Sequence, residues 1–299
     1  MITSQHSVGK TVRMGQLINA ESQHTVTVAI DHGLGGMVAG IGNLEPVLEQ
    51  IIAAEPDAII MSMGVAKRFG HLFGGRGKPS IIITVDRRLS STLPGHTARG
   101  EEYRLLVNVE DALLIGATAV KMVMIYGRST LPVHANNVEA VATIARQCDR
   151  YQVPLLLEPV LWGKLATEAD KENLNVLKHI CRMGFEWGAD ILKTNYTGDT
   201  ATFRNVVETC PIPIVILGGS KMDTEGAVLT TVAGAMKAGA IGVAFGRNIF
   251  QHPDPTAIIG ALRQIVHEGA SVKLALEYMQ LAQSKSDEHN RKINRNHST

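Results

Sequence analysis

The sequence predicts a single (β/α)8 barrel, and three observations lead to that fold class. Short apolar runs alternate with longer segments of helical spacing, eight times over about 245 residues, which is the size of such a barrel. The 299 residues are 45% hydrophobic and 4% aromatic, so a large core of branched aliphatic side chains is available. A doubly wound sheet usually has fewer strand–helix units and ranks second.

The eight strands are expected where apolar or β-branched residues follow one another and a polar or glycine-containing turn ends the run. In chain order they cover residues 25–30, 58–61, 80–84, 119–125, 153–157, 190–193, 214–217 and 241–245. Helices are expected where apolar residues recur at helical spacing, at 44–54, 65–69, 109–115, 138–150, 171–187, 201–209, 223–238 and 255–268. Gly116, Gly188 and Gly239 end three of these helices just before a strand.

Two segments follow the eighth unit. Residues 271–283 have the spacing of a further helix, so the barrel domain is expected to span residues 1–283. Residues 284–299 are almost entirely polar and are expected to form a disordered or partner-dependent tail.

Charge and cysteine usage exclude several classes of partner. A formal net charge of +1 provides no field for nucleic acid or acidic membranes. Cys148, Cys181 and Cys210 show neither disulfide nor metal-ligand spacing and indicate reduced thiols of a cytoplasmic protein. The polar start lacks the apolar segment of a signal peptide, and no apolar run is long enough for a bilayer. The histidines are scattered, so we expect no metal and no cofactor.

Polar residues follow seven of the eight predicted strands, at the end where barrels carry their active sites. A single polar residue at a strand end can serve folding stability, but polar residues at seven strand ends of one barrel face are better explained by a functional site. In strand order the candidates are Asp31 and His32, Asp86 to Arg88, Tyr126, Glu158, Lys193, Gly218 to Ser220, and Gly246 to Asn248.

Lys193 closes the sixth apolar run and is a candidate nucleophile. Desolvation lowers the pKa of an amine, and an amine must be neutral to form a Schiff base with a carbonyl. The pKa would have to fall from roughly 10.4 to near 7, about 4 kcal/mol of differential interaction, which one buried site can supply. The alternative is an ordinary strand-end lysine whose head lies in solvent.

Carboxylates near Lys193 are candidates for proton transfer. Asp31 ends the first strand and could shuttle a proton across the barrel, or it could cap a turn. His32 is either a second polar contact or a satisfied turn residue. Glu158 follows three leucines, so it is either paired with Lys193 or Lys121, or raised in pKa to act as an acid. A pair between Lys121 and Glu158 on neighbouring strands is expected.

The last two loops predict a phosphate site. Loops after the seventh and eighth strands of barrels recurrently bind phosphate through backbone N–H groups. Gly218 and Gly219 let the backbone approach an anion, and Ser220 adds a hydroxyl. Gly246 precedes Arg247, whose guanidinium is a planar anion-binding fork.

Four motifs then make the chain look familiar. They are AIDHG at 29–33, LKTNYTGD at 192–199, GGS at 218–220 and FGRNIFQ at 245–251. Over residues 10–280 the chain resembles the archaeal-type class I fructose-bisphosphate aldolase family, within the deoxyribose-phosphate and tagatose-bisphosphate aldolase group. That group includes a heptulosonate synthase and an autoinducer-2 thiolase, and most of its members are large homo-oligomers.

The resemblance implies roles for individual residues. Lys193 would be the Schiff-base lysine, Asp31 a proton-transfer residue, and the two glycine-containing loops the phosphate site. Family members usually have a tyrosine near the end of the fifth strand, followed by Pro-Arg-Gly, whereas here Val160 stands at that position. Glu158 or Tyr126 would then replace the tyrosine as proton donor.

Three functions are therefore weighed. The first is a class I aldolase that cleaves or forms a carbon–carbon bond in a phosphorylated keto-sugar through Lys193. The second is a transaldolase-like or thiolase-like transferase that uses the same lysine on a phosphorylated ketone. The third is a phosphosugar-binding barrel that lost its activity together with the tyrosine.

Overall fold

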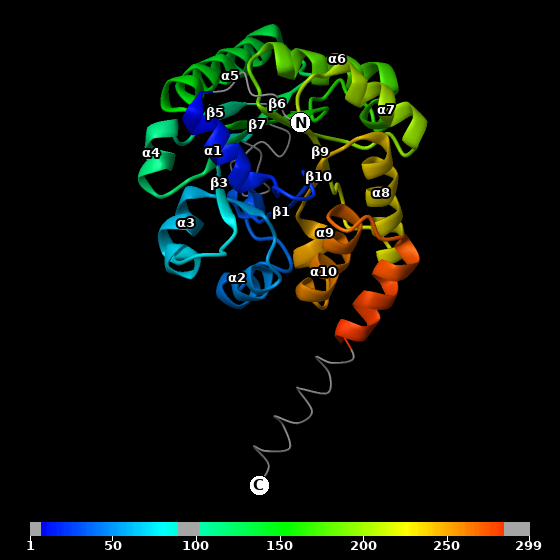
Figure 1. The fold of residues 1–299 in the computed structure, drawn as a ribbon. Coiled ribbons are helices and arrows are strands. Elements are labelled where there is room, and N and C mark those ends of the chain that lie inside the picture. The colour runs from blue at the N-terminus through cyan, green and yellow to red at the C-terminus, as the bar shows by residue number, and fades with distance from the viewer. Residues whose placement is uncertain (1–6, 89–101, 284–299) are drawn as a thin grey trace.

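Eight parallel strands close into a barrel in the computed structural model, which describes residues 7–88 and 102–283. Around the barrel the strand order is β1-β10-β9-β8-β7-β6-β3-β2 (Figure 1). The bounds are β1 Thr25–Ala29, β2 Ala58–Met61, β3 Ser80–Thr84, β6 Ala119–Ile125, β7 Leu155–Val160, β8 Ile191–Thr194, β9 Ile214–Leu217 and β10 Gly242–Phe245. Every predicted strand is present in the predicted order, so the fold class is confirmed.

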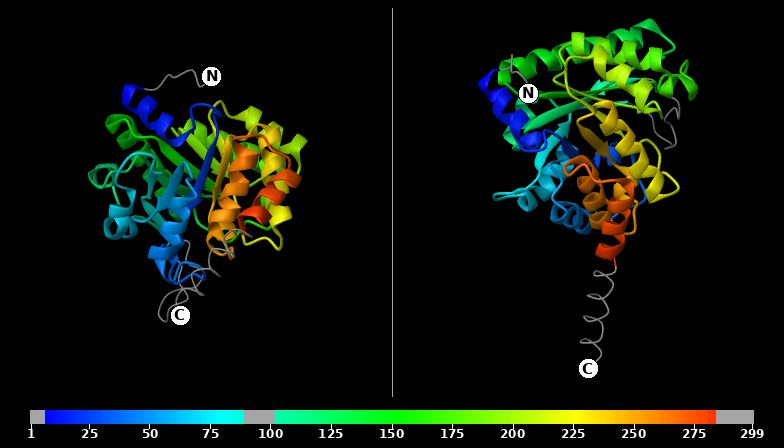
Figure 2. Two further views of the ribbon diagram at one scale, coloured as in Figure 1. Left: turned by 60° about the horizontal axis from the view of Figure 1, so that its bottom comes forward. Right: turned by 45° about the vertical axis from the view of Figure 1, so that its right-hand side comes forward.

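Helices surround the barrel on its outer side (Figure 2). Those between strands are α2 Leu44–Ala53, α3 Met63–Phe69, α4 Val109–Leu114, α5 Leu131–Tyr151, α6 Leu174–Glu186, α7 Thr200–Thr209 and α8 Glu225–Ala238, and α10 Pro255–Val266 follows the last strand. Side chains of Asn173, Asp199, Thr224 and Asp254 accept N–H bonds from the first turns that follow them. Residues 272–283 form the expected further helix, and the expected polar tail lies outside the described residues.

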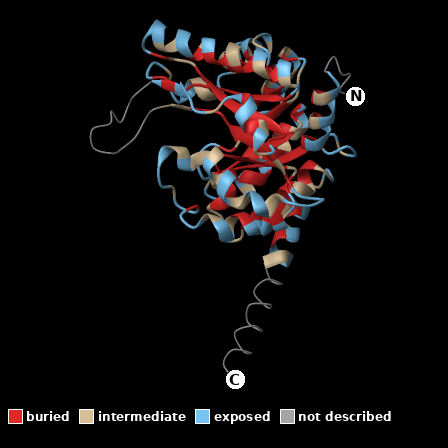
Figure 3. Cartoon of the chain, turned by 90° about the vertical axis from the view of Figure 1, so that its left-hand side faces the viewer, coloured by how far each residue is buried: buried red, intermediate tan, exposed pale blue. Residues whose placement is uncertain are grey.

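An apolar floor fills the amino-terminal half of the barrel. α1 (Val8–Leu17), which the sequence analysis did not predict, closes this floor with Met14 and Leu17. The strand side chains that share this cluster are small or branched: Ala29, Ala58, Ile60, Ile82, Ala119, Leu156, Ile191, Val215 and Ala244. Figure 3 shows the strands as the buried centre of the molecule. Thr25 and Thr27 of β1 are buried polar residues at the level of this floor, and their hydroxyl groups lie 3.3 Å apart.

A buried ion pair attaches α1 to the barrel. Lys10 is 5% exposed, and its Nζ lies 2.7 Å from Asp149 and 2.9 Å from Asp190. Burial alone would lower the pKa of Lys10, but the two carboxylates raise it above its usual value. In the sequence this lysine makes the first segment look like an exposed polar one. Its burial depends on Asp149 and Asp190, which are distant in the chain.

Other differences from the predicted elements are local. β4 (Asp86–Arg88) and β5 (Tyr103–Leu105) form an unpredicted antiparallel pair, and α9 (Arg247–Phe250) is a short unpredicted helix. In the described part of the chain, loops also contain the 3-10 helices η1 Asp31–Gly35, η2 Gly70–Phe73 and η3 Ala169–Glu172. α5 starts at Leu131, well before the predicted residue 138. Pro132 lies in its first turn, where proline favours the start of a helix.

Strand β7 continues past its predicted end at residue 157. Glu158 and Pro159 were expected to close the strand, but they lie inside it. Pro159 is tolerated because the pairing of β7 with β8 ends at Leu157, so a missing N–H there costs no bond in that ladder. Glu158 is therefore a buried strand residue.

Among the described residues, no helix combines the length and the apolar character that crossing a membrane requires.

Candidate active site

Four charged side chains form a layer above the apolar floor. Lys121, Glu158 and Lys193 each stand two residues after a floor residue of the same strand, and Asp31 stands two residues after Ala29. Because side chains alternate along a strand, the same period that directs the floor residues inward directs these four inward as well. The carboxyl ends of four strands thus meet at one charged cluster.

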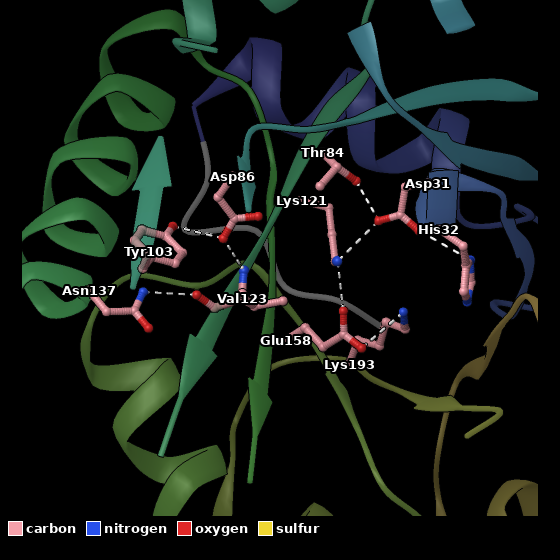
Figure 4. Close-up of polar contacts among 10 residues, drawn as sticks. All are labelled: Asp31, His32, Thr84, Asp86, Tyr103, Lys121, Val123, Asn137, Glu158 and Lys193. Atoms are coloured by element: carbon pink, nitrogen blue, oxygen red, sulfur yellow. Dashed lines mark hydrogen bonds and ion pairs between the residues drawn. The ribbon is translucent and has the colours of Figure 1, made fainter. Parts of the chain in front are cut away.

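The charged cluster, defined as Asp31, Lys121, Glu158 and Lys193, is a chain of ion pairs (Figure 4). Lys121 Nζ lies 3.2 Å from Asp31 Oδ2 and 2.9 Å from Glu158 Oε2. Lys193 Nζ lies 3.1 Å from Glu158 Oε1. Thr84 Oγ1 at the end of β3 donates to Asp31 Oδ2 over 2.7 Å. Glu158 therefore bridges two lysines, and Asp31 reaches Lys193 through Lys121 and Glu158.

Opposite charges outweigh burial in this cluster. Desolvation alone would raise the pKa of Asp31, but Lys121 and Lys193 bring it well below its usual value. The same balance lowers the pKa of Glu158, through Lys121 first and Lys193 second. Burial would lower the pKa of Lys121, yet Asp31 and Glu158 hold it well above its usual range. Both carboxyl groups are thus ionised at neutral pH and can accept protons.

The outcome for Glu158 decides between the two alternatives weighed from the sequence. The expected pair with Lys121 is confirmed, and Lys193 is paired with the same carboxylate. The alternative, a raised pKa that would make Glu158 an acid, is excluded because its two lysine partners lower its pKa. Lys193 is 6% exposed, so its ammonium head is not in bulk solvent.

Tyr126 does not join the charged cluster. Its ring lies 6.3 Å from that of Trp187 and 5.9 Å from that of His134, on the helix side of the barrel wall. Burial raises the pKa of its hydroxyl well above the usual value. Val160, where the resemblance placed a tyrosine, is a fully buried apolar residue. The structure therefore leaves Glu158 and Asp31 as the acids and bases next to Lys193.

His32 lies between the charged cluster and the last loop. Its Nδ1 is 3.7 Å from Asp31 Oδ1, and its ring meets the edge of Phe250 with centroids 5.0 Å apart. Burial lowers the pKa of His32, and although Asp31 opposes this, Lys193 and Arg247 act in the same direction as burial. The imidazole is therefore neutral at neutral pH and can both donate and accept a hydrogen bond.

The loops after β9 and β10 are held together by Asn248, which the sequence placed among the strand-end candidates without a role of its own. Its Nδ2 donates to Gly218 O over 2.8 Å and to Ser220 O over 3.2 Å, and its Oδ1 accepts from Met222 N–H. In the described ranges the N–H groups of Gly219 and Ser220 donate to no acceptor. Asn248 thus joins a loop with two unbonded N–H donors to the short helix that begins at Arg247, and unbonded backbone donors are what an anion site uses. The only hint in the sequence was the polar residue after Arg247.

The sequence profile described as DeoC/LacD family aldolase matches residues 25–252. This range contains all eight barrel strands, the charged cluster and both glycine-containing loops. The chain belongs to the DeoC/LacD aldolase family.

Relatives of this DeoC/LacD aldolase match over nearly their whole length. An uncharacterized aldolase of Saccharolobus solfataricus is 31% identical over 273 residues, which are 91% of this chain and 99% of that protein. The 2-amino-3,7-dideoxy-D-threo-hept-6-ulosonate synthase 1 of Archaeoglobus fulgidus is 33% identical over 276 residues, with 91% and 96% covered.

One similar protein of known structure was captured with a reaction intermediate bound to its catalytic lysine. It is an archaeal fructose-1,6-bisphosphate aldolase with its catalytic lysine covalently bound to the carbinolamine intermediate, and it is 25% identical with a TM-score of 0.73. The match covers 86% of this chain and 99% of that chain. The protein is a class I aldolase, an enzyme that works through a lysine Schiff base, and the resemblance seen in the motifs is confirmed.

Gly246 is a position where this DeoC/LacD aldolase has no room for a side chain. A Cβ there would collide with His32 and would lie 2.7 Å from Ala29 O. We expect Gly246→Ala to displace His32 or the loop and to raise KM about tenfold or more, because a shift of an ångström weakens an anion site strongly. Gly33→Ala is the matched control, since a Cβ at Gly33 meets nothing within 4 Å. Steady-state kinetics would contradict the prediction if both variants kept the wild-type KM.

Asp86 is a further buried carboxyl group of the aldolase, which lies near the charged cluster but does not belong to it. Its Oδ2 accepts from Tyr103 OH over 2.7 Å and from Val123 N–H over 2.6 Å (Figure 4). Burial raises its pKa to about 6, against Lys121 and the two hydrogen bonds, which lower it. Because this folded-state pKa exceeds the unfolded value of roughly 3.9, folding stability is lost as pH rises from about 4 to about 6.

Asp86→Asn should therefore stabilise the aldolase in a pH-dependent way. The amide oxygen can keep both hydrogen bonds without the cost of a buried charge, so unfolding free energy should rise by about 1–3 kcal/mol at pH 7.5. At pH 5 the gain should be smaller, because the wild-type group is already largely protonated. Urea unfolding at both pH values measures this, with exposed Asp223→Asn as control. A gain that is larger at pH 5 would refute it.

Proposed function

We propose that Lys193 is the Schiff-base lysine of this class I aldolase and that the substrate is a phosphorylated ketose. The observation that carries the proposal is the 3.1 Å contact between Lys193 Nζ and the ionised Glu158. Lys193 must lose a proton before it attacks a carbonyl, and Glu158 is the acceptor beside it. Glu158 stays paired with Lys121 while this happens, so the buried site never holds an isolated charge.

The proton that Glu158 accepts is then used to form the iminium. The neutral amine adds to the ketone, an internal proton shift gives the carbinolamine, and protonated Glu158 returns its proton to the hydroxyl, which leaves as water. The net change converts an ammonium ion and a ketone into an iminium ion and water. The resulting cation again lies beside an ionised Glu158, which stabilises it electrostatically. Glu158 thereby takes the acid role that Val160 cannot supply.

Asp31 is proposed to act in the cleavage step. When the carbon–carbon bond breaks, its electron pair moves into the iminium to form an enamine, and the substrate hydroxyl loses its proton as the aldehyde forms. Asp31 is ionised, and Thr84 and Lys121 hold one of its oxygens, so the other is available to accept that proton. Protonation of the enamine and hydrolysis of the iminium then release the second product and regenerate Lys193.

The phosphate of the substrate is assigned to the loops after β9 and β10. Gly218, Gly219, Ser220, Gly246 and Arg247 surround this region, and neutral His32 lies between it and Asp31. The names of the relatives support a phosphorylated ketose, since one is an archaeal fructose-1,6-bisphosphate aldolase.

The test is reductive trapping. Borohydride with dihydroxyacetone phosphate or a panel of phosphorylated ketoses should leave a reduced adduct on the peptide that contains Lys193, located by mass spectrometry. EDTA should not inhibit cleavage. An adduct on another lysine, or none with any ketose, would sink the proposal. Adding a second carbonyl compound or coenzyme A to the same assay separates cleavage from group transfer.

We also propose that the enzyme is a cytoplasmic homo-oligomer. Its three cysteines are free and buried, which suits a reducing compartment. Leu274 and Leu281 on the last described helix are 57% and 65% exposed, and a partner subunit would cover them. Light scattering during size-exclusion chromatography should give a mass that is a multiple of 32.2 kDa, and a monomer would refute the oligomer.

A further inference from the structure

Arg87 is a half-buried cation at the mouth of the barrel that forms no ion pair with a described residue. It lies on β4, three residues after Thr84, and its guanidinium packs on Gly35, with Cζ 3.1 Å from where a Cβ of that glycine would stand. Asp31 and Asp86 are the acidic groups that act on it electrostatically. Within residues 7–88 and 102–283 it forms no hydrogen bond and no ion pair.

The neighbouring arginine differs in this respect. Arg88 Nη1 donates to Trp162 O over 2.8 Å, in the loop after β7. Because successive side chains of a strand point to opposite faces, Arg88 turns toward β7 while Arg87 turns toward the loop after β1. Burial first and the charge of Arg88 second lower the pKa of Arg87, although Asp31 and Asp86 oppose this. An anionic group of a ligand would favour the charged guanidinium further.

The barrel order places Arg87 across the mouth from the proposed phosphate loops. β3 and β9 are four strands apart in both directions around the barrel, so they face each other. The charged cluster lies between them: β8, β7 and β6 carry Lys193, Glu158 and Lys121 on one side, and Asp31 follows β1 on the other. A linear ligand with one end at Gly219 and its middle at Lys193 therefore points its other end at Arg87.

We propose that Arg87 binds a second anionic group, a phosphate or a carboxylate, at the end of the substrate opposite the phosphate held by the loops after β9 and β10. The direction of the ligand rests on the proposed function, because Lys193 sets where the carbonyl lies. An arginine fork suits both anions, since each offers two oxygens at the spacing of the guanidinium N–H groups. Arg87 then makes the enzyme prefer substrates with an anionic group at both ends over substrates with one anionic group.

Ligands without a carbonyl test this site apart from the chemistry. Isothermal titration should give glucitol 1,6-bisphosphate a Kd about tenfold or more below that of glucitol 6-phosphate. In Arg87→Gln this ratio should fall to about twofold while the Kd of glucitol 6-phosphate is unchanged. Arg104→Gln is the matched control, because Arg104 pairs with Arg87 across the β4–β5 ladder but is bound to Tyr103 O and Glu102. 6-Phosphogluconate, with a carboxylate at one end, shows which anion suffices.

Each outcome decides the matter. A wild-type ratio near one, or an unchanged ratio in Arg87→Gln, overturns the proposal. So does an equal loss of both ligands, which would make Arg87 a support of the Gly35 loop. Binding of 6-phosphogluconate as tight as that of the bisphosphate supports the site with a carboxylate, and weaker binding supports it with phosphate alone. An Arg87-dependent ratio without any borohydride adduct on Lys193 would leave the anion site standing and refute only the Schiff-base assignment.

Discussion

Lys193→Ala should reduce kcat/KM for cleavage by about 10⁴-fold or more, because it removes the amine that forms the iminium, and two carboxylates hold the other amine of the cluster, Lys121, in its charged form. Borohydride should then trap no adduct with any phosphorylated ketose. The phosphate loops remain intact in this variant, so the Kd for glucitol 6-phosphate should change by less than about tenfold. Steady-state kinetics, intact-protein mass spectrometry and titration measure the three quantities.

The variant is expected to fold, which makes the result interpretable. Glu158 loses one partner but keeps Lys121 at 2.9 Å, so no carboxylate is left unpaired. Lys273→Ala is the control for removal of a lysine, since the Lys273 side chain is 86% exposed on the last described helix. Cleavage within tenfold of wild type in Lys193→Ala would refute the assignment of the nucleophile.

Lys121→Met should destabilise the protein by about 3 kcal/mol at pH 7.5, since it removes the shared cation of two buried carboxylates. Asp31 then loses its lysine partner, whereas Glu158 keeps Lys193. Cleavage should fall together with stability, because Asp31 would no longer be ionised at neutral pH. Urea unfolding followed by circular dichroism gives the free energy, with Lys273→Met as control.

The loss of unfolding free energy in Lys121→Met should become smaller as pH falls. In the wild type the pKa values of Asp31 and Glu158 are lowered by folding. Their contribution to folding stability is therefore fully present above the pKa of an unfolded carboxyl group, about 4, and it is lost as pH falls below that value. Without Lys121, burial dominates and raises the pKa of Asp31, so ionisation opposes folding at neutral pH. At pH 5 protonation relieves that penalty. A deficit that is equal at pH 5 and pH 7.5 would contradict this account.

A double variant separates stability from chemistry. Lys121→Met with Asp31→Asn removes the buried carboxylate together with its cation, and it should recover most of the lost stability. It should not recover cleavage, since no base is left at residue 31. Recovered activity would show that Asp31 takes no part in proton transfer.

Much of the site could be predicted because strands obey a short period. Lys193, Glu158 and Lys121 each follow an inward-facing apolar residue by two positions, so their direction was encoded in neighbouring residues. The pair between Lys121 and Glu158 was accessible for the same reason, as β6 and β7 are consecutive strands of the barrel. Tyr126 shows the limit of this reasoning: it follows the same strand as Lys121 but with odd spacing, which directs its ring to the helices.

Contacts between distant segments were not accessible from the sequence. Asn248 binds the loop after β9 from the loop after β10, and Lys10 joins α1 to residues more than a hundred positions away. The β4–β5 pair that carries Arg87 was missed because its strands are only three residues long and are separated in sequence. Short elements give weak periodic signals, so only pairing in the fold defines them.

The sequence by itself therefore determined the barrel, the order of its strands, the family and the identity of the residues at the strand ends, since all of these depend on local periodicity and motif. Only the tertiary structure decided how those residues share protons and charge. Closing the barrel places Glu158 between two lysines, leaves Tyr126 outside and sets β3, which precedes Arg87, opposite β9. The physical reason is that a pKa depends on the charges and the water around a group in space, which residues distant in the chain supply.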